Sequence, residues 1–360
     1  MITRRALNRA TLARQHLLAR TTGPAEDVIR HLGGLQAQAP LAPYVGLWTR
    51  LDGFRPDELA ALITGRRAVR GSAMRATVHL MTAEDFVAFR PVVQIVLDRG
   101  FAGQAFGKGL AGLDVDDLLA AARELVEERP RTRVELGRLL QERWPDHDRD
   151  SLSYAVGYLQ PMVQVPPRGV WGTTGPAAWT TVASWLDRPV GPVTPPDDLV
   201  LRYLGAFGPA TVMDVQAWSG LTRLREVLDR LRPRLVVLRG EDGAELFDLP
   251  DAPRPGADVA APVRFLPEYD NLLLSHADRS RVNPAGRRVP LPPGNGATAG
   301  TLLVDGDWCA TWKLTPTALA ITPFAPIAPD DQTAVTREAV ELLAFLRPEV
   351  DNGDVLWFIS

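Results

Sequence analysis

Two glutamines, Gln36 and Gln38, stand one residue apart in this sequence of 360 residues. The two glycines before them can end a helix by adopting positive φ, and Pro40 disfavours helix for the residue that precedes it. The segment between them is therefore predicted to be extended, so that both amides share one face. Two amides held side by side in a cleft could form hydrogen bonds with a water molecule or with the edge of a base. The alternative is a pair of loop glutamines that cap backbone groups.

The elements that must position these amides follow the order of a winged helix. Helical patterns precede a hairpin, and they cover residues 3–19, 24–32, 41–51 and 55–64. A two-residue period from Ala68 to Met81 predicts the hairpin, which would form the wing. In this register Arg75 and His79 share one face. His79 can be explained equally well as a core histidine or as an active-site residue.

Three helices followed by a hairpin occur again twice along the chain. Helical patterns lie at residues 115–129, 133–143 and 150–160, and then at 197–207, 212–219 and 221–231. After Pro262 short strand patterns take over, at residues 263–266, 287–291, 300–305, 308–313, 318–323 and 355–359, with a closing helix at 335–346. We predict an α+β protein with three tandem winged-helix modules and a small C-terminal β-barrel-like domain. The predicted boundaries are 1–112, 113–190, 197–250 and 258–360.

Composition excludes several classes of protein. A hydrophobic content of 46% with 23% charged residues is typical of a soluble globular protein, and no apolar run reaches the ~18–20 residues that span a bilayer. No apolar signal core follows the N-terminal arginines, so we expect a cytoplasmic location. The single cysteine, Cys309, and five scattered histidines form no metal-ligand pattern, and no phosphate-binding loop is present, so we expect neither metal nor cofactor.

Any positively charged surface must be a local patch, because the chain as a whole has a net charge of −3. Nucleic-acid binding can still depend on a patch. Four arginines without an intervening acid follow residue 278: Arg279, Arg281, Arg287 and Arg288. Four more lie opposite the apolar stripe of the first helix, where they could be solvated or contact phosphates: Arg4, Arg5, Arg9 and Arg14.

Four stretches resemble the AlkZ/YcaQ family of winged-helix DNA glycosylases, in the order and spacing of that family. They are LQAQAPLAPYVGLWTRL (35–51), SAMRATVHLMTAEDF (72–86), FLPEYDNLLLSHADRSRV (265–282) and GDWCATWKLT (306–315). AlkZ-like members carry two glutamines around an apolar residue, whereas YcaQ-like members place an aspartate second. Gln36-Ala37-Gln38 therefore resembles the AlkZ branch, which implies that Gln36 and Gln38 are catalytic.

The resemblance implies an enzyme that acts on double-stranded DNA carrying alkylated purines. The family also contains enzymes that unhook interstrand crosslinks, and the sequence leaves open whether this chain accepts them; we expect a monomer. The resemblance also implies DNA contacts for Arg75 and His79, and modestly for the loop that carries Arg279, Arg281, Arg287 and Arg288. This activity fits the chemistry of an amide. A glutamine is no general base at neutral pH, but it can accept a proton from water at its carbonyl, donate from its NH2 group and orient the water.

Such weak assistance suits a lesion whose leaving group departs readily. An N7-alkylated guanine is cationic, its release gives a neutral base, and the sugar develops oxocarbenium character. The alternative function is a non-catalytic winged-helix DNA-binding protein or regulator. A regulator usually shows dimer symmetry and an effector domain, and the sequence indicates neither.

Overall fold

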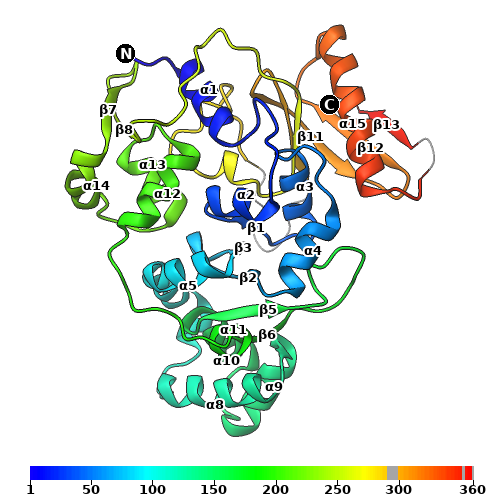
Figure 1. Cartoon of the computed structure of the whole chain (residues 1–360). Coiled ribbons are helices and arrows are strands. Elements are labelled where there is room, and N and C mark those ends of the chain that lie inside the picture. Colours follow the sequence, from blue (N-terminus) through cyan, green and yellow to red (C-terminus); the bar gives the residue numbers. More distant parts are fainter. Residues whose placement is uncertain (290–298, 351–352, 359–360) are drawn as a thin grey trace.

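The computed structural model describes residues 1–289, 299–350 and 353–358. Two hairpins that the sequence assigns to separate modules share one six-stranded sheet in the order β1-β3-β2-β5-β6-β4 (Figure 1). The strands are β1 Leu35–Gln36, β2 Ala68–Ser72, β3 Val78–Thr82, β4 Arg131–Thr132, β5 Met162–Val165 and β6 Ala178–Thr181. The hairpins meet where Arg70 on β2 pairs with Gln164 on β5. The first two predicted modules are therefore joined through their sheet.

The helices of the N-terminal part surround β1, β2 and β3. They are α1 Arg4–Arg14, α2 Ala25–His31, α3 Ala42–Trp48, α4 Pro56–Thr64, α5 Ala83–Val92, α6 Gln94–Ala102 and α7 Ala105–Lys108. A short 3-10 turn at Met74–Ala76 connects β2 to β3. The first helix ends at Arg14 instead of at the predicted residue 19, because His16 adopts a positive φ of 55° and turns the chain.

Three units of the chain repeat one connection. The second unit contains α8 Val115–Glu128, α9 Arg133–Arg143, α10 Arg149–Leu159 and the hairpin β5–β6, followed by α11 Val182–Leu186. The third contains α12 Asp197–Phe207, α13 Val212–Ser219, α14 Arg225–Leu231 and the hairpin β7 Val236–Arg239 with β8 Glu245–Asp248. In each unit an extended segment between two helices (α2 and α3, α8 and α9, or α12 and α13) pairs with the later hairpin strand: β1 with β3, β4 with β6, and Ala210 with Phe247.

The C-terminal part is an open sheet, so the predicted barrel is wrong. Its order is β13-β12-β11-β10-β9, and β9 and β13 are its edges within the described residues. The strands are β9 Arg264–Leu266, β10 Gly300–Val304, β11 Asp307–Leu314, β12 Ala318–Pro323 and β13 Asp354–Trp357. Helix α15, Pro329–Leu346, packs Val335, Ala339 and Leu342 into the core of this sheet, which covers the face that a barrel would enclose. The predicted strand 287–291 is absent at residues 287–289, and its last two residues lie outside the described part.

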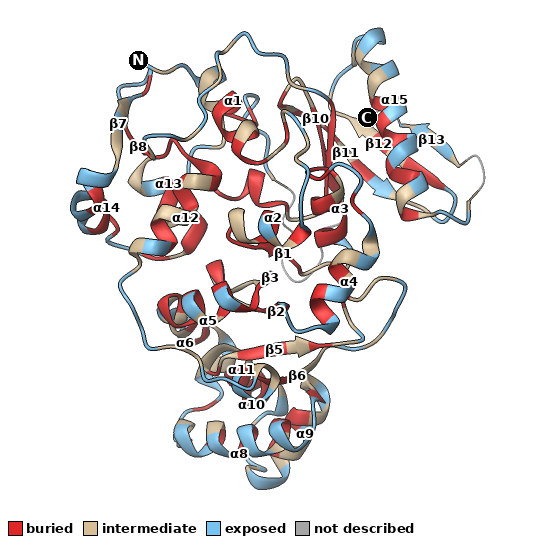
Figure 2. Cartoon of the chain, viewed as in Figure 1, coloured by how far each residue is buried: buried red, intermediate tan, exposed pale blue. Residues whose placement is uncertain are grey.

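The central strands are buried, and the C-terminal sheet packs against the N-terminal helices (Figure 2). Val45 of α3 belongs to the core of the C-terminal sheet, whereas Leu35 and Leu80 of β1 and β3 belong to the neighbouring core. Among the described residues, no helix is long and apolar enough to cross a bilayer. The strand β1 is therefore buried in the core of the N-terminal part, and the helix α3 that follows it packs against the C-terminal sheet.

Candidate active site

A glycine pair turns the chain from α2 into β1 and directs the two glutamines. Gly33 and Gly34 have φ of 66° and 102°. A Cβ on Gly34 would come within 2.7 Å of Met81 Cγ, so this position excludes other residues. On β1, Gln36 pairs with His79 of β3 in an antiparallel register. Because directly opposed side chains share a face of the sheet, Gln36 and His79 are neighbours.

A relay of hydrogen bonds fixes the orientation of both amides. Arg75 Nη2 donates to Gln36 Oε1 at 2.8 Å, and Gln36 Nε2 donates to Gln38 Oε1 at 2.5 Å. A guanidinium has only donors, so Gln36 must present its oxygen to Arg75 and its nitrogen to Gln38. The predicted adjacency of the two amides is confirmed. In this arrangement the NH2 group of Gln38 has no hydrogen-bond partner among the described residues, and the use of the two amides in catalysis stays a prediction.

Two further guanidinium contacts tie this relay to the rest of the molecule. Arg75 has a φ of 55°, and its Nη1 donates to the Trp218 carbonyl and its Nη2 to Asn271 Oδ1, both at 2.8 Å. Asn271 Nδ2 in turn donates to the Gly34 carbonyl at 3.3 Å. Sequence reasoning missed Asn271, although it lies inside the matched 265–282 stretch. Burial, and then the charge of Arg279, lowers the pKa of Arg75 to about 10, so it remains protonated at neutral pH.

His79 is fully buried beside Gln36, and it is neutral. Its Nδ1 lies 3.0 Å from the Thr77 carbonyl, which holds the proton on that nitrogen. Burial, and then the charge of Arg75, lowers the pKa of His79 to about 3. The structure thus brings Gln36, Gln38, Arg75 and His79 together, whereas the DNA contacts predicted for Arg75 and His79 stay a prediction.

The backbone between the glutamines is held by a buried cation. Arg70 Nη2 donates to the Ala37 carbonyl at 2.6 Å, and the Arg70 side chain is almost fully buried. Burial, and then the charge of Arg168, lowers the pKa of Arg70 to about 10. The extended segment that carries the two amides is therefore held by a hydrogen bond at Ala37 as well as by the one at Gln36.

Comparison with known proteins assigns the chain that carries this site to a protein family. A family model described as DNA glycosylase AlkZ-like matches residues 29–345. The chain belongs to this family. The matched range contains all of the glutamine relay, including Asn271. The family model therefore supports reading the site as part of a DNA glycosylase, an enzyme that hydrolyses an N-glycosidic bond.

A curated relative and a solved structure agree with the AlkZ-like assignment. The chain is 24% identical over 358 residues to the interstrand DNA cross-link repair glycosylase of Streptomyces sahachiroi, covering 92% of this chain and 93% of the relative. It is also similar to the structure of Streptomyces sahachiroi DNA glycosylase AlkZ, with a TM-score of 0.74, 21% identity and full coverage of both chains. The structural likeness shows that the AlkZ fold is shared.

The basic loop predicted to contact DNA in this AlkZ-like enzyme divides into buried and exposed arginines. Arg281 is buried, and it donates to Thr11 Oγ1 at 3.2 Å and to the Pro209 carbonyl at 3.0 Å. The structure therefore contradicts its prediction as a DNA contact, because its charge faces Asp214 in the interior. Arg279 is half-buried, whereas Arg287 and Arg288 are exposed. Arg287 lies over the Phe324 ring, 4.5 Å from its centroid.

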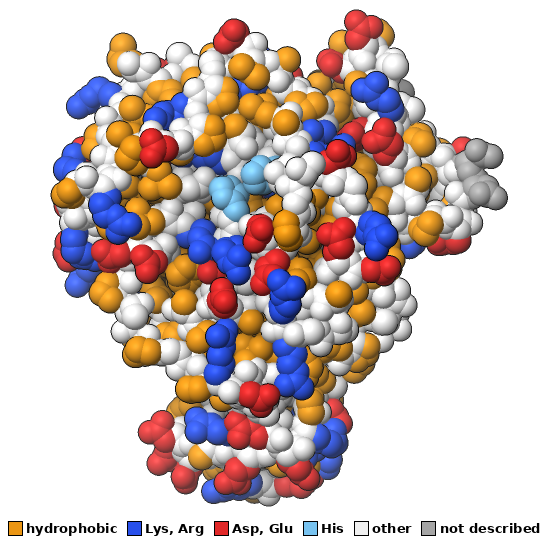
Figure 3. Space-filling model, viewed as in Figure 1, with side chains coloured by type: hydrophobic (Ala, Val, Ile, Leu, Met, Phe, Trp, Pro, Cys, Tyr) orange, Lys and Arg blue, Asp and Glu red, His pale blue; other side chains and the backbone are white. Residues whose placement is uncertain are grey.

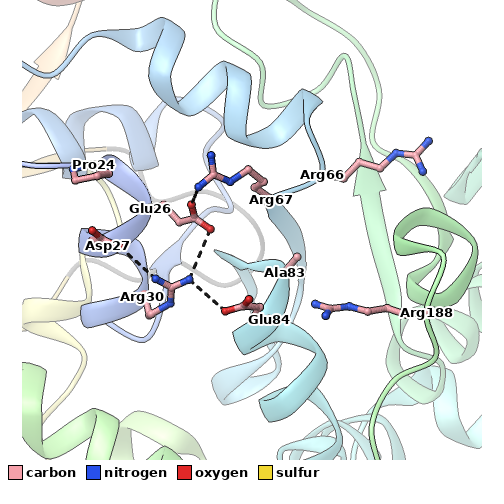
Figure 4. Close-up of a pocket in the computed structure, with 9 residues that line it drawn as sticks. All are labelled: Pro24, Glu26, Asp27, Arg30, Arg66, Arg67, Ala83, Glu84 and Arg188. Carbon is pink, nitrogen blue, oxygen red and sulfur yellow. Dashed lines mark hydrogen bonds and ion pairs between the residues drawn. The ribbon is translucent and has the colours of Figure 1, made fainter.

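A charged hollow elsewhere on this AlkZ-like fold does not extend the site. It has a volume of about 600 Å³, and Arg30 and Arg67 line it together with Glu26, Asp27 and Glu84 (Figure 4). Arg30 pairs with Asp27 and Glu84, both at 3.2 Å, and Arg67 pairs with Glu26. Arg66 and Arg188 also line the hollow, but the three carboxylates among the lining residues offset most of its positive charge.

Acid is expected to destabilise the fold through His79 and His276. Burial, and then the charge of Arg281, also lowers the pKa of His276 to about 3. Both folded values lie below the unfolded value of 6.5, so the unfolded chain binds protons first as the pH falls. The contribution of each neutral histidine to the free energy of unfolding is complete above pH 6.5 and is lost progressively below it. At pH 5 the loss is about 2 kcal/mol for each histidine.

Urea unfolding at pH 8 and pH 5 measures this loss. His276→Leu should reduce the difference between the two free energies of unfolding by about 2 kcal/mol, because one histidine with a lowered pKa is gone while His16, His31 and His79 remain. Equal free energies of unfolding at pH 8 and pH 5 in the wild type would contradict the prediction.

Proposed function

We propose that this enzyme hydrolyses the N-glycosidic bond of N-alkylated purines, with N7-alkylguanine in double-stranded DNA as its substrate class. We further propose that it unhooks interstrand crosslinks, in DNA repair or in self-resistance to a genotoxin. The observation that supports this most is the relay from Arg75 through Gln36 to Gln38. It holds two amides rigidly and offers no strong base, which suits a leaving group that is already cationic. The similarity to an interstrand cross-link repair glycosylase supports the crosslink assignment.

The amides act in this proposal as fixed dipoles around a water molecule and the reacting sugar. Preorganised dipoles stabilise the developing charge without rearranging during the reaction. We propose that no metal takes part. Within the described residues, no three His, Cys, Asp or Glu side chains are grouped so that they could hold an ion.

The repeated helix and hairpin units are proposed to be winged-helix modules that hold duplex DNA for a monomeric enzyme. Each unit places an extended segment between its early helices and pairs it with the hairpin. Gln36 lies on that segment in the first unit. Figure 3 shows a face on which basic and acidic side chains are mixed, so the DNA-binding surface in this proposal is a local one.

The test is release of free base from a duplex that carries one N7-methylguanine. Wild-type enzyme should release N7-methylguanine and leave an abasic site, in buffer with excess EDTA as well as without it. A second duplex, crosslinked through N7 of guanines on both strands, tests unhooking. Absence of base release from the first duplex overturns the proposed activity, and abolition by EDTA with rescue by zinc or magnesium overturns the metal-free mechanism.

Charge reversal at Arg287 and Arg288 should weaken duplex binding and flatten its salt dependence. Both side chains are exposed beside the basic loop. The slope of log affinity against log salt should fall by about one for each phosphate that the protein no longer neutralises. Binding titrations across a salt series measure this slope.

The matched control for this prediction is charge reversal at Arg123 and Arg129. Arg123 lies on α8, and Arg129 directly follows the C-terminal end of this helix. They are exposed too, but they lie in the second unit, so their reversal should change the slope less. Equal slopes after the two double reversals would remove Arg287 and Arg288 from the DNA-binding surface.

A further inference from the structure

One buried acceptor beside the glutamine pair has no hydrogen-bond partner in the described structure: His79 Nε2. His79 is 0% exposed, and leaving a polar atom unpaired at such a site costs free energy. The ring is held from its other side, because Nδ1 lies against the Thr77 carbonyl. The proton therefore sits on Nδ1, and Nε2 carries a free lone pair.

This lone pair belongs to a side chain on the same face of the sheet as the paired amides. Gln36 and His79 are directly opposed partners on β1 and β3, and the Ala37 amide donates to the Val78 carbonyl at 2.8 Å, which keeps the strands paired beyond them. Gln38 is bonded to Gln36 on this face. The histidine and both amides thus form one cluster.

The cluster needs a base that the amides do not supply. Gln36 Oε1 accepts from Arg75 and Gln38 Oε1 accepts from Gln36, and although each oxygen keeps a second lone pair, an amide oxygen is too weak a base to take up a proton at neutral pH. An amide NH2 can donate to a water oxygen, but it cannot receive the proton that the water loses on attack. Among the buried acceptors without a partner in the described part of the chain, His79 Nε2 is the one that lies opposite one of the paired glutamines.

We propose that His79 is a catalytic residue whose Nε2 accepts the proton of the attacking water, while the Gln36–Gln38 pair holds that water. In this step the bond between the sugar C1′ and N9 of the base breaks, and its electron pair neutralises the cationic N7-alkylguanine. One O–H bond of the water breaks as the new C1′–O bond forms, and its proton moves to Nε2. The protonated imidazole then releases the proton to solvent. This inference rests on the hydrolysis proposed above.

A weak base is sufficient for this role. The sugar that the water attacks has oxocarbenium character, so the water becomes strongly acidic as its bond to C1′ forms. Burial beside the cation of Arg75 keeps the imidazole neutral and ready to accept. The same environment favours rapid loss of the proton afterwards.

The experiment compares single-turnover release of N7-methylguanine from duplex DNA by four variants. His79→Leu and His79→Phe remove the acceptor, and the phenylalanine keeps a flat ring. His79→Gln can restore an acceptor oxygen. His276→Leu is the matched control, because His276 is similarly buried, is neutral and also has one unpartnered ring nitrogen, but lies against Phe207.

We expect about a hundredfold slower release for His79→Leu and His79→Phe, at the lower end of the range for general-base catalysis. His79→Gln should lose about tenfold, and His276→Leu less than about threefold despite a similar fall in melting temperature. Duplex binding should stay within about threefold of wild type in all four variants, because phosphate contacts carry most of the affinity. If His79→Leu does not fold, the rate of base release by His79→Phe tests the role of His79.

Three results would overturn the role of His79. The first is release at close to the wild-type rate by a folded His79→Phe protein, and the second is an equal loss in His276→Leu. The third is a rate loss that is matched by loss of duplex binding. Failure of the wild type to release base is a different result, because it rejects the proposed function itself.

Discussion

Replacing either Gln36 or Gln38 with alanine is expected to slow single-turnover excision by roughly ten- to a thousandfold. This corresponds to about 1.4–4 kcal/mol of lost transition-state stabilisation. Gln36→Ala removes the link between Arg75 and Gln38, and Gln38→Ala removes the free NH2 group at the end of the relay. Duplex binding should change much less, because the residues proposed to contact phosphates are other side chains. Rates and binding are measured on the same protein preparations.

Two substitutions at position 38 separate polarity from bulk. Gln38→Asp should retain part of the activity, since a carboxylate still accepts from Gln36 Nε2 and the YcaQ-like pattern places an aspartate there. Gln38→Leu should not, because it keeps the bulk and loses the dipole. If the glutamines only stabilise the fold, both alanine variants will melt at lower temperature but excise at the wild-type rate. A double mutant with full activity would remove these residues from catalysis.

The pairing of the glutamines could be predicted because it depends on local chain geometry. Two glycines with positive φ, an extended segment and a following proline are enough to direct residues i and i+2 to one face. The same alternation placed Arg75 and His79 on the neighbouring hairpin, although Arg75 sits in the turn and not on a strand. The family resemblance then turned this local geometry into a chemical function, and the family match agrees with it.

The orientation of the amides could not be predicted, because it depends on partners that are distant in sequence. Asn271 lies 196 residues from Arg75, and the Trp218 carbonyl lies 143 residues from it. These contacts help to aim the guanidinium at Gln36 Oε1, and the guanidinium in turn sets the orientation of the Gln36 amide. The hydrogen-bond direction at Gln38 is a property of the whole fold.

Buried arginines limit what a charge pattern in the sequence can predict about phosphate contacts. Arg14 lies on the polar side of the first helix, yet it is buried and pairs with Asp248 at 2.6 Å across 234 residues. Arg281 is buried as well, close to Asp214. Helical periodicity separates polar from apolar faces, but it cannot show that a distant carboxylate will cover the polar face. Similarly, strand patterns do not distinguish a closed barrel from an open sheet covered by α15.

Removing the carboxylate of Asp270 is expected to cost about 3–5 kcal/mol in the free energy of unfolding, measured by urea titration. Asp270 accepts from Arg50 Nη1 and Nη2, both at 2.9 Å, and both side chains are almost fully buried. Asp270→Ala would leave the Arg50 charge buried without its partner, which is the costly case for an ion pair. It would also remove the cap on the Leu272 amide, which begins the turn that carries Asn271.

Glu142→Ala is the matched control for Asp270→Ala, because it breaks the exposed pair of Arg138 and Glu142 at 2.6 Å. An exposed i,i+4 pair contributes about 0.3–0.5 kcal/mol, so this variant should unfold close to the wild-type midpoint. The double replacement Arg50→Met with Asp270→Leu should be more stable than Asp270→Ala, since it removes the buried charge as well as its partner. Similar losses in Asp270→Ala and Glu142→Ala would mean that this pair does not hold the turn Asn271–Leu273 against the segment that follows α3, and that Asn271 is positioned by other contacts.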